Sequence, residues 1–496
     1  MKYFNSTTMK QTLLITIAAL LSCYGFSQNR AINWAFGDSA GLNFETDTPT
    51  YFYSGITTHE VSASISDEAG NLLFYTNSRK IWNREHSLMI NGDHLINGTH
   101  ELSSVTQGTI ILPDPGNEDR YYVINLEYPL NYSIVNMNID GGLGAVEVGE
   151  KNIEFDTAFY CTEKMQAVRH ANGRDWWLVV QGLPEGGIFG FGLTFPFYGF
   201  LVSPEGISGP QVQEGVIYED QDAKIYIGQM KFNQQGTLLA CTNGRSVIIY
   251  NFDRCSGYLS YYATIDSIFE GYNTDFLYGL EFSPNSQRLY VTKEGIPGKA
   301  YLYQYTLDSI ADIKATEQII YINNESGSNQ KILSQLQLAP DNKIYVALVG
   351  SYDNPTTALC VINNPDASGM ACDFDTLTVN TGGRTIEIGL PNMPNYNLGV
   401  MEKSGCDTIG TTAVNNINKN AIQLYPNPAH NYIYLKQAPL GIVQIHIADI
   451  YGKELLYVNQ NGADIINISS LSSGLYFITI TQENEMLITQ KLVVER

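Results

Sequence analysis

A degenerate repeat of short strands and tight turns runs through most of the chain and limits its fold more than any other feature. Each copy has an apolar–polar–apolar strand, a turn rich in Pro, Asp, Asn and Gly, and a second apolar strand. The clearest copies span residues 230–239, 280–291 and 336–346. A unit of this kind cannot bury both of its faces alone, so the copies are expected to stack on one another.

The spacing of the repeat indicates the architecture. The six recognisable copies begin at Ala63, Thr109, Ala167, Met230, Leu280 and Leu336. The steps between these starts are 46, 58, 63, 50 and 56 residues. A period of this length with four short strands per unit is typical of a β-propeller. Strand-like residues 31–36 and 386–390 are expected to form a seventh blade together, which would remove open sheet edges. Six or eight blades are the alternatives.

Composition agrees with an all-β protein of several domains. The 496 residues include 33 Tyr and 44 Gly, and only 16% of them are charged. Such a composition favours many strands and tight turns. The formal net charge is −22, which argues against nucleic acid and anionic membranes as partners because both would be repelled. An acidic surface also keeps a protein soluble, so it needs no ligand to explain it.

The N-terminal residues predict export. Lys2 and Lys10 flank a polar start, and residues 13–21 form an apolar run too short for a membrane span. We expect a signal peptide over residues 1–27, with cleavage between Ser27 and Gln28. The alternative is a lipoprotein signal that would lipidate Cys23. No other stretch is apolar and long enough to form a transmembrane segment.

After signal cleavage the chain would retain six cysteines, an even number that favours disulfides in an exported protein. Short loops make Cys241–Cys255 and Cys360–Cys372 the expected pairs, and buried free thiols are the alternative. Six cysteines allow fifteen pairings, so the sequence alone leaves the choice open. The absence of a CxxC spacing argues against zinc and thioredoxin-like chemistry.

Strong catalytic motifs are absent, including the GxSxG elbow, the HExxH helix and the phosphate-binding loop. The candidate acid–base or ligand-binding groups of the propeller are His59, His94, His100 and His170. His59 and His100 each precede Glu and a strand-like run, which could place them at a blade end near the axis. The alternative interpretation is that these histidines lie in turns and have only a structural role. We predict no catalytic residue, cofactor or metal.

Two further features have competing interpretations. The acidic clusters at 219–222 and 373–375 lack the residue order of a calcium loop, which favours solvated loop charge. Residues 186–200 concentrate aromatic side chains among glycines. Exposed aromatics could stack on sugars or anchor a protein. Packing between blades is the favoured interpretation, because aromatic residues of strands are usually buried.

The last 76 residues, 421–496, carry four ordered motif blocks. They are Leu-Tyr-Pro-Asn-Pro-Ala from Leu424, a strand at 443–449 with its turn, residues 468–478, and a terminal strand at 490–494. The segment resembles the type A C-terminal sorting domain of the type IX secretion system of Bacteroidota. The resemblance implies a small β-sandwich, the secretion machinery and its sorting peptidase as partners, and passage through the periplasm to the outer surface or medium. The motif residues that it implies for turns and strand packing are Pro426, Asn427, Pro428, Gly452, Lys453, Gly474 and Tyr476.

The region before the sorting domain, from about 33 to 400, resembles a family of exported Bacteroidota propeller proteins. The matching phrases lie at residues 71–76, 81–84, 168–177, 251–257 and 389–392. We therefore expect an all-β chain with a seven-bladed propeller over 28–402, a linker over 403–420 and a sorting domain over 421–496. The resemblance implies no activity. Because the propeller scaffold carries no convergent catalytic set, the expected function is binding of a protein or glycan ligand. The alternatives are a lactonase-like or glycan-processing hydrolase, and a structural component of adhesion or gliding.

Overall fold

The computed structural model divides the chain into two compact units, Met1–Ile409 and Gly410–Arg496. The structure describes residues 29–96, 104–126, 129–155, 159–183, 193–218, 224–266, 276–294, 299–307, 312–325, 329–351, 353–406, 423–436, 442–449, 453–461, 465–482 and 485–495. The predicted signal peptide and its cleavage site, Ser27–Gln28, lie outside these residues, as does most of the predicted linker.

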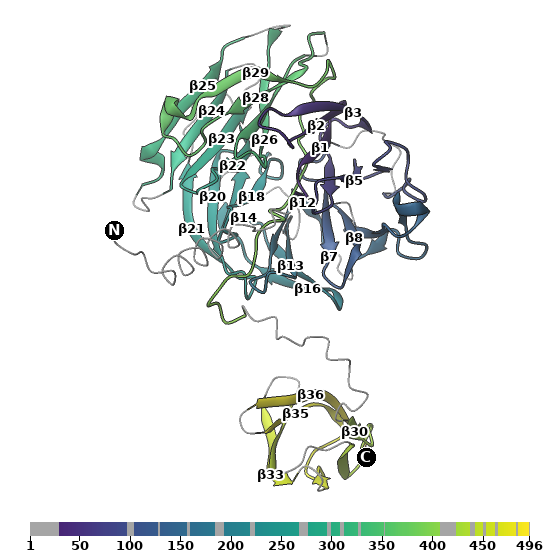
Figure 1. Ribbon diagram of the computed structural model, residues 1–496. Helices are drawn as coiled ribbons and strands as arrows, with labels where there is room; N and C mark the ends of the chain where they lie inside the picture. Colours follow the sequence, from purple (N-terminus) through teal and green to yellow (C-terminus); the bar gives the residue numbers. More distant parts are fainter. Residues whose placement is uncertain are drawn as a thin grey trace, which may run out of the picture. The chain divides into compact units, whose positions relative to one another are not determined.

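The first unit consists of antiparallel sheets that follow one another along the chain and surround a common axis (Figure 1). The first sheets contain β1 (Asn33–Phe36), β2 (Asp38–Asn43) and β3 (Thr50–Thr57), then β4 (Ala63–Ser66), β5 (Leu72–Thr76) and β6 (Ile81–Asn83). The next contains β7 (Thr109–Asp114), β8 (Asn117–Asn125), β9 (Asn131–Asn136), β10 (Ala145–Val146) and β11 (Ile153–Glu154).

The remaining sheets of this unit are mostly four-stranded. Their strands are β12 (Cys161–Arg169), β13 (Trp176–Gly182), β15 (Phe197–Ser203) and β16 (Gly206–Gln213), then β18 (Met230–Phe232), β19 (Leu238–Asn243), β20 (Ser246–Phe252) and β21 (Leu259–Asp266). These are followed by β22 (Phe276–Phe282), β23 (Arg288–Glu294), β24 (Ala300–Thr306) and β25 (Gln318–Asn323), then β26 (Ile332–Leu338), β27 (Ile344–Val349), β28 (Ala358–Ile362) and β29 (Phe374–Asn380). A two-stranded sheet pairs β14 (Leu193–Thr194) with β17 (Ile217–Tyr218), and the described 3-10 helices are η1 (Asp140–Gly142), η2 (Lys314–Thr316) and η4 (Gly369–Cys372).

The first strand of each sheet lies nearest the axis. These strands pack in sequence order, β1 with β4, β4 with β7, β7 with β12, β12 with β18, β18 with β22 and β22 with β26. The last sheet meets the first through aromatic packing, with the Trp34 and Tyr345 ring centroids 5.6 Å apart. Apolar clusters fill the space between neighbouring sheets. This arrangement is a β-propeller, and it confirms the predicted fold class.

The turns of the repeat form for the reason that the sequence suggests, because short polar side chains bind the backbone of their own turn. The side-chain oxygen of Asn233 accepts hydrogen bonds from Thr237 N at 2.8 Å and Leu238 N at 3.0 Å. Ser283 Oγ accepts one from Arg288 N at 3.0 Å in the equivalent turn of another copy. The turn residues therefore hold each first strand against the second.

The prediction that residues 386–390 complete a blade is wrong. We call residues 386–398 the axial segment, because it contains no strand and runs through the middle of the ring, as the green trace in Figure 1 shows. Asn392 N donates to Ser62 O at 2.8 Å, while the Tyr396 hydroxyl donates to Ile111 O at 2.8 Å. Pro391 and Pro394 have no N–H for a strand ladder, which explains why this segment does not pair as a strand.

The predicted pairing of Cys241 with Cys255 is also wrong, because Cys255 forms a disulfide with Cys406. Cys241 lies in the middle of β19, opposite Ile248 of β20, and its side chain is buried. Cys255 lies beyond the far end of β20, so strand pairing separates two cysteines that are close in sequence. Cys360 and Cys372 are buried free thiols rather than the expected pair. Cys360 stands opposite Val346 in the ladder of β28, while Cys372 ends η4.

The second unit has two sheets around one core. The strands are β30 (Gln423–Tyr425), β31 (Tyr432–Lys436) and β34 (Ile466–Asn467) in one sheet, with β32 (Ile442–Ala448), β33 (Glu454–Asn461), β35 (Gly474–Gln482) and β36 (Glu485–Val494) in the other. Their apolar residues share one buried cluster. Asn427 bridges to β36 by donating to Lys491 O at 2.7 Å and accepting from Val493 N at 2.9 Å. Tyr476 donates its hydroxyl hydrogen to Ser472 O at 2.9 Å. Gly452 lies outside the described residues.

Within the described part of the chain, no helix combines the length and apolar character needed to cross a bilayer.

Candidate functional site

Asn392 closes the centre of the propeller axis. Its amide nitrogen donates to Thr109 O and Met165 O, both at 3.1 Å. Its amide oxygen accepts from the side chains of Gln107 at 3.2 Å and Gln166 at 3.1 Å. Asn392 is buried, so these bonds satisfy an amide that would otherwise be costly to remove from water. One side chain of the axial segment thus links the first strands of two sheets.

Other glutamines cross-link the axis in the same way. Gln229 accepts from Leu280 N at 3.1 Å and from Leu336 N at 2.9 Å. Gln335 donates to Thr106 O at 2.7 Å and accepts from Leu390 N at 2.9 Å. The axis is therefore filled by bonded amide groups. The axis has two ends. We call the end at which the first strands of the sheets begin the start-side mouth, and the end at which these strands finish the end-side mouth.

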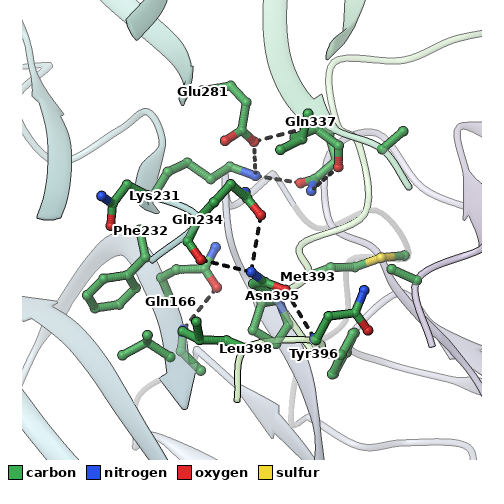
Figure 2. Close-up of a pocket in the computed structure, with 18 of the residues that line it drawn as sticks. Gln166, Lys231, Phe232, Gln234, Glu281, Gln337, Met393, Asn395, Tyr396 and Leu398 are labelled. Carbon is green, nitrogen blue, oxygen red and sulfur yellow. Dashed lines mark hydrogen bonds and ion pairs between the residues drawn. The ribbon is translucent and has the colours of Figure 1, made fainter. Parts of the chain in front are cut away.

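The end-side mouth contains a polar cavity of about 140 Å³. Figure 2 shows its lining side chains converging from several elements. Four consecutive first strands, β12, β18, β22 and β26, supply Gln166, Lys231, Glu281 and Gln337 respectively. The axial segment supplies Asn395, Tyr396 and Leu398 from the opposite side.

A buried ion pair lies in the wall of this pocket. Lys231 Nζ lies 3.3 Å from Glu281 Oε2, and Lys231 also donates to Gln337 Oε1. Burial raises the pKa of Glu281 and lowers the pKa of Lys231, and the opposite charge of each partner works against its shift. Glu281 additionally accepts backbone hydrogen bonds from Phe282 N at 3.0 Å and Leu338 N at 3.1 Å. Through these hydrogen bonds the Glu281 carboxylate connects β22 with β26.

The rest of the pocket lining favours reversible binding. Asn395 Nδ2 donates to Gln234 O and to Gln234 Oε1, both at 3.1 Å (Figure 2). Asn233, Asn342 and Asn397 add further carboxamides. The described lining holds no Ser, Thr, Cys or His. Its Lys231 and Glu281 are paired with each other, and they also bond to β26. Carboxamides both donate and accept, which suits neutral ligands that carry hydroxyl or amide groups.

The start-side mouth gathers two carboxylates. Glu163 Oε2 accepts from Thr106 N at 3.0 Å and from Thr106 Oγ1 at 2.8 Å. Burial raises the pKa of Glu163 to about 7, with a further rise from the charge of Glu60, although the Thr106 hydrogen bonds lower it. Glu60 is itself buried, and it accepts from Ser104 Oγ at 2.9 Å and from the Tyr278 hydroxyl. Glu163 can thus carry a proton near neutral pH.

His59 also lies at the start-side mouth. Its Nδ1 is 2.9 Å from Oε2 of Glu387, which directly follows Ile386 in the axial segment. The hydrogen bond to Glu387 raises the pKa of His59, the negative charges of Glu387 and Glu60 add to this, and burial opposes it. The structure therefore places one sequence-predicted histidine beside the axis, where it binds the entering segment.

The other histidine candidates are not brought together with His59. His170 lies in a turn, where its Nε2 contacts Cys255 O at 2.9 Å and its Nδ1 accepts from Asn172 N at 3.1 Å. His94 pairs with its neighbour Asp93 and is largely exposed. His100 lies outside the described residues, so its role stays a prediction.

Described aromatics of residues 186–200 pack in the interior. Phe195, Phe197 and Phe200 are all buried, which agrees with the interpretation as inter-blade packing. Residues 184–192 and the acidic cluster at 219–222 lie outside the described residues. In the second acidic cluster, Asp375 accepts a hydrogen bond from Asn363 at 3.0 Å.

The sequence contains a signal for the polar residues that line the axis. Lys231, Glu281 and Gln337 occupy the middle of the apolar–polar–apolar strand in the three clearest repeat copies. A polar residue recurring there indicates a side chain directed toward the axis, because alternate residues of a strand share one face.

Comparison with known proteins gives one match by sequence family. Residues 423–495 match the secretion system C-terminal sorting domain. No curated protein matches the sequence of the chain.

Several solved structures resemble the chain weakly in fold. The periplasmic gluconolactonase PpgL of Pseudomonas aeruginosa is 10% identical, with a TM-score of 0.38 over 84% of this chain and 93% of that one. A putative 6-phosphogluconolactonase of Bacteroides fragilis is 11% identical, with a TM-score of 0.34 over 67% and 97%. The β-propeller domain of Cps50 (Swd1) from Myceliophteria thermophila is 9% identical, with a TM-score of 0.34 over 63% and 86%. Likeness at this level carries no argument about activity, and the propeller assignment rests on the sheets described above.

The sorting-domain match agrees with the motif blocks and with the bonding of Asn427 and Tyr476 inside the second unit. It indicates that the type IX secretion system exports this protein to the cell surface or the surrounding medium.

Proposed function

We propose that the protein is a non-catalytic binding module, presented at the cell surface or released after type IX export, and that the end-side pocket holds its ligand. The observation that carries this proposal is the occupied axis. Asn392 and the surrounding glutamines fill the centre of the ring with bonded amide groups. Ligand recognition is then left to the amide-rich end-side pocket. We also propose that the propeller has seven blades, and the seven sheets from β1–β3 to β26–β29 support this count.

The chemistry of the pocket supports a neutral ligand with hydroxyl or amide groups, such as a glycan end or a peptide loop. Its ion pair is internally compensated, since Lys231 and Glu281 neutralise each other. Asn395 and Gln234 line the pocket as half-buried residues, and their carboxamides bond to each other, so a ligand would exchange this bond for its own. Such groups orient a ligand without activating a nucleophile.

The test is a glycan array and a pull-down of extracellular proteins with the full exported chain, each followed by titration calorimetry. We expect a ligand whose dissociation constant rises about tenfold in Asn395→Ala, because one to two hydrogen bonds of the rim are lost. Asn138→Ala, an exposed residue outside the pocket, is the matched control and should bind as the wild type does. A ligand bound equally by both variants would place recognition elsewhere.

A hydrolase is the second candidate, and the start-side mouth favours it. Glu163, with its pKa of about 7, could act as a general acid beside the Glu60 side chain. We would measure hydrolysis of aryl glycosides and lactones by the wild type and by Glu163→Gln. Turnover that disappears in Glu163→Gln, while the fold is retained, would establish the hydrolase over the binding module.

A further inference from the structure

Two tyrosines stand side by side on the outside of the first sheet. Tyr51 and Tyr53 occupy alternate positions of the edge strand β3, so they project from the same face. Their side chains are 53% and 50% exposed, and their ring centroids are 5.9 Å apart with planes inclined at 39°. Paired, half-exposed aromatic rings on a strand are unusual, because strand aromatics are usually buried.

The turn that follows β29 supports both rings from one side. The Arg384 guanidinium lies 4.6 Å from the centre of the Tyr53 ring, and the Tyr53 hydroxyl donates to Gly382 O at 3.3 Å. Gly382 also lies against Tyr51, since a Cβ built at this glycine would come within 2.6 Å of the ring. Each ring thus has one supported side and one exposed side.

The supporting turn is itself held in place. Thr381 is fully buried, and its hydroxyl donates to Thr357 O at 2.7 Å. Gly382 N donates to the side chain of Asn380 at 2.8 Å. The rings are therefore positioned before a ligand arrives, which lowers the entropy that binding must remove.

From these contacts we propose that Tyr51 and Tyr53 form a platform that binds a neutral polysaccharide by stacking on its pyranose rings. A pyranose ring has a C–H face that packs on an aromatic face. Arg384 covers the opposite side of the Tyr53 ring, which leaves the exposed side for the sugar. The net charge of −22 disfavours anionic polymers. The proposal goes beyond the proposed function, because none of these residues lines the end-side pocket.

The experiment is native affinity electrophoresis of the full exported chain in gels that contain hydroxyethylcellulose, xyloglucan, glucomannan, laminarin or xylan. We expect at least one polymer to retard the wild type. The double variant Tyr51→Ala/Tyr53→Ala should weaken that retardation at least about tenfold, because two stacking surfaces are removed. The conservative variant Tyr51→Phe/Tyr53→Phe keeps both rings and should retain most of the binding.

Two controls decide the interpretation. Tyr258→Ala/Tyr261→Ala removes two other tyrosines near or on the edge strand β21, each 57% exposed, and should leave retardation unchanged. Asn395→Ala alters the end-side pocket and should also leave it unchanged, which separates this platform from the proposed function. The proposal is overturned if none of the five polymers retards the wild type. It is also overturned if Tyr51→Ala/Tyr53→Ala and Tyr258→Ala/Tyr261→Ala lose retardation equally. Circular dichroism of each variant identifies any loss caused by unfolding.

Discussion

At the scale of single residues, the described polar groups of the axis are used mainly to hold the ring together. Asn392, Gln107 and Gln166 bond to each other and to the backbone of the first strands. The charged pair Lys231–Glu281 likewise connects neighbouring sheets. Buried polar groups that are fully bonded favour one arrangement of the core over others. These residues thus select the register of the sheets around the axis.

Asn392→Ala should lower the free energy of unfolding by about 2–4 kcal/mol, because it leaves several buried partners without a hydrogen bond. Urea denaturation followed by the fluorescence of the buried Trp34 and Trp176 measures this. Asn395→Ala, at the rim, should change stability by less than about 1 kcal/mol. Equal losses in the two variants would show that Asn392 is not the central link.

Glu163 should make stability depend on pH in a defined direction. Its pKa is about 7 in the folded protein, against 4.5 for the ordinary group, so the folded state binds this proton more tightly than the unfolded state. Its stabilising contribution is then present below about pH 4.5 and is lost as the pH rises through about 7. The loss is on the order of 3 kcal/mol.

Glu163→Gln removes this titration, so the wild type should lose stability relative to the variant between pH 4.5 and 7. Thermal unfolding across this pH range measures the difference. In Glu118→Gln, at an exposed position near the start of β8, the stability should change with pH in parallel to that of the wild type. If the difference in stability between the wild type and Glu163→Gln were the same at every pH, this would contradict a raised pKa of Glu163.

At the scale of elements, the axial segment completes the propeller in place of a shared blade. It enters beside His59 and Glu60, crosses the centre at Asn392, and ends at the end-side mouth. Beyond it, Arg254 donates to Gly399 O, and the Cys255–Cys406 disulfide closes a loop of sequence separation 151. The chain after the axis is therefore attached to the turn between β20 and β21.

Gly389→Ala should displace the axial segment, since a Cβ at this position would lie 1.6 Å from Glu60 O. A backbone atom cannot move aside as a flexible side chain can, so we expect a loss of about 3 kcal/mol or more in the free energy of unfolding. Near-UV circular dichroism and thermal unfolding measure it. In Gly399→Ala the added Cβ has open space around it, so this variant should be as stable as the wild type. Similar losses of stability in the two variants would argue against a close contact between Gly389 and Glu60.

At the scale of the whole molecule, the two units have separate cores. The buried cluster of the second unit contains only residues from Ala429 to Val494. The clusters of the first unit contain only residues up to Tyr396. Each core can therefore form from its own segment of chain.

Removal of residues 410–496 should leave the propeller transition of the full chain unchanged within about 2 °C, because none of its core residues is lost. Differential scanning calorimetry of the full chain and the shortened chain measures this. A large fall in the propeller transition would show that the second unit contributes to the stability of the first.

Much of the architecture was predictable because it depends on local patterns. Alternating apolar residues and turn-forming Asn, Asp, Pro and Gly indicated the strands of each sheet, and turns such as the one at Asn233 form through neighbouring residues. The motif blocks of the last 76 residues were predictable for the same reason, and the family match at residues 423–495 agrees with them.

The sequence by itself determined the all-β class, the strand-and-turn pattern of the propeller and the sorting domain, because these features arise from contacts between residues close in sequence. The tertiary structure decided the path of residues 386–398, the partner of Cys255 and the neighbours of Lys231 and Glu163. These contacts join residues that are tens to hundreds of positions apart. Their formation depends on which strand faces the axis and on closure of the ring, and no local pattern records either one.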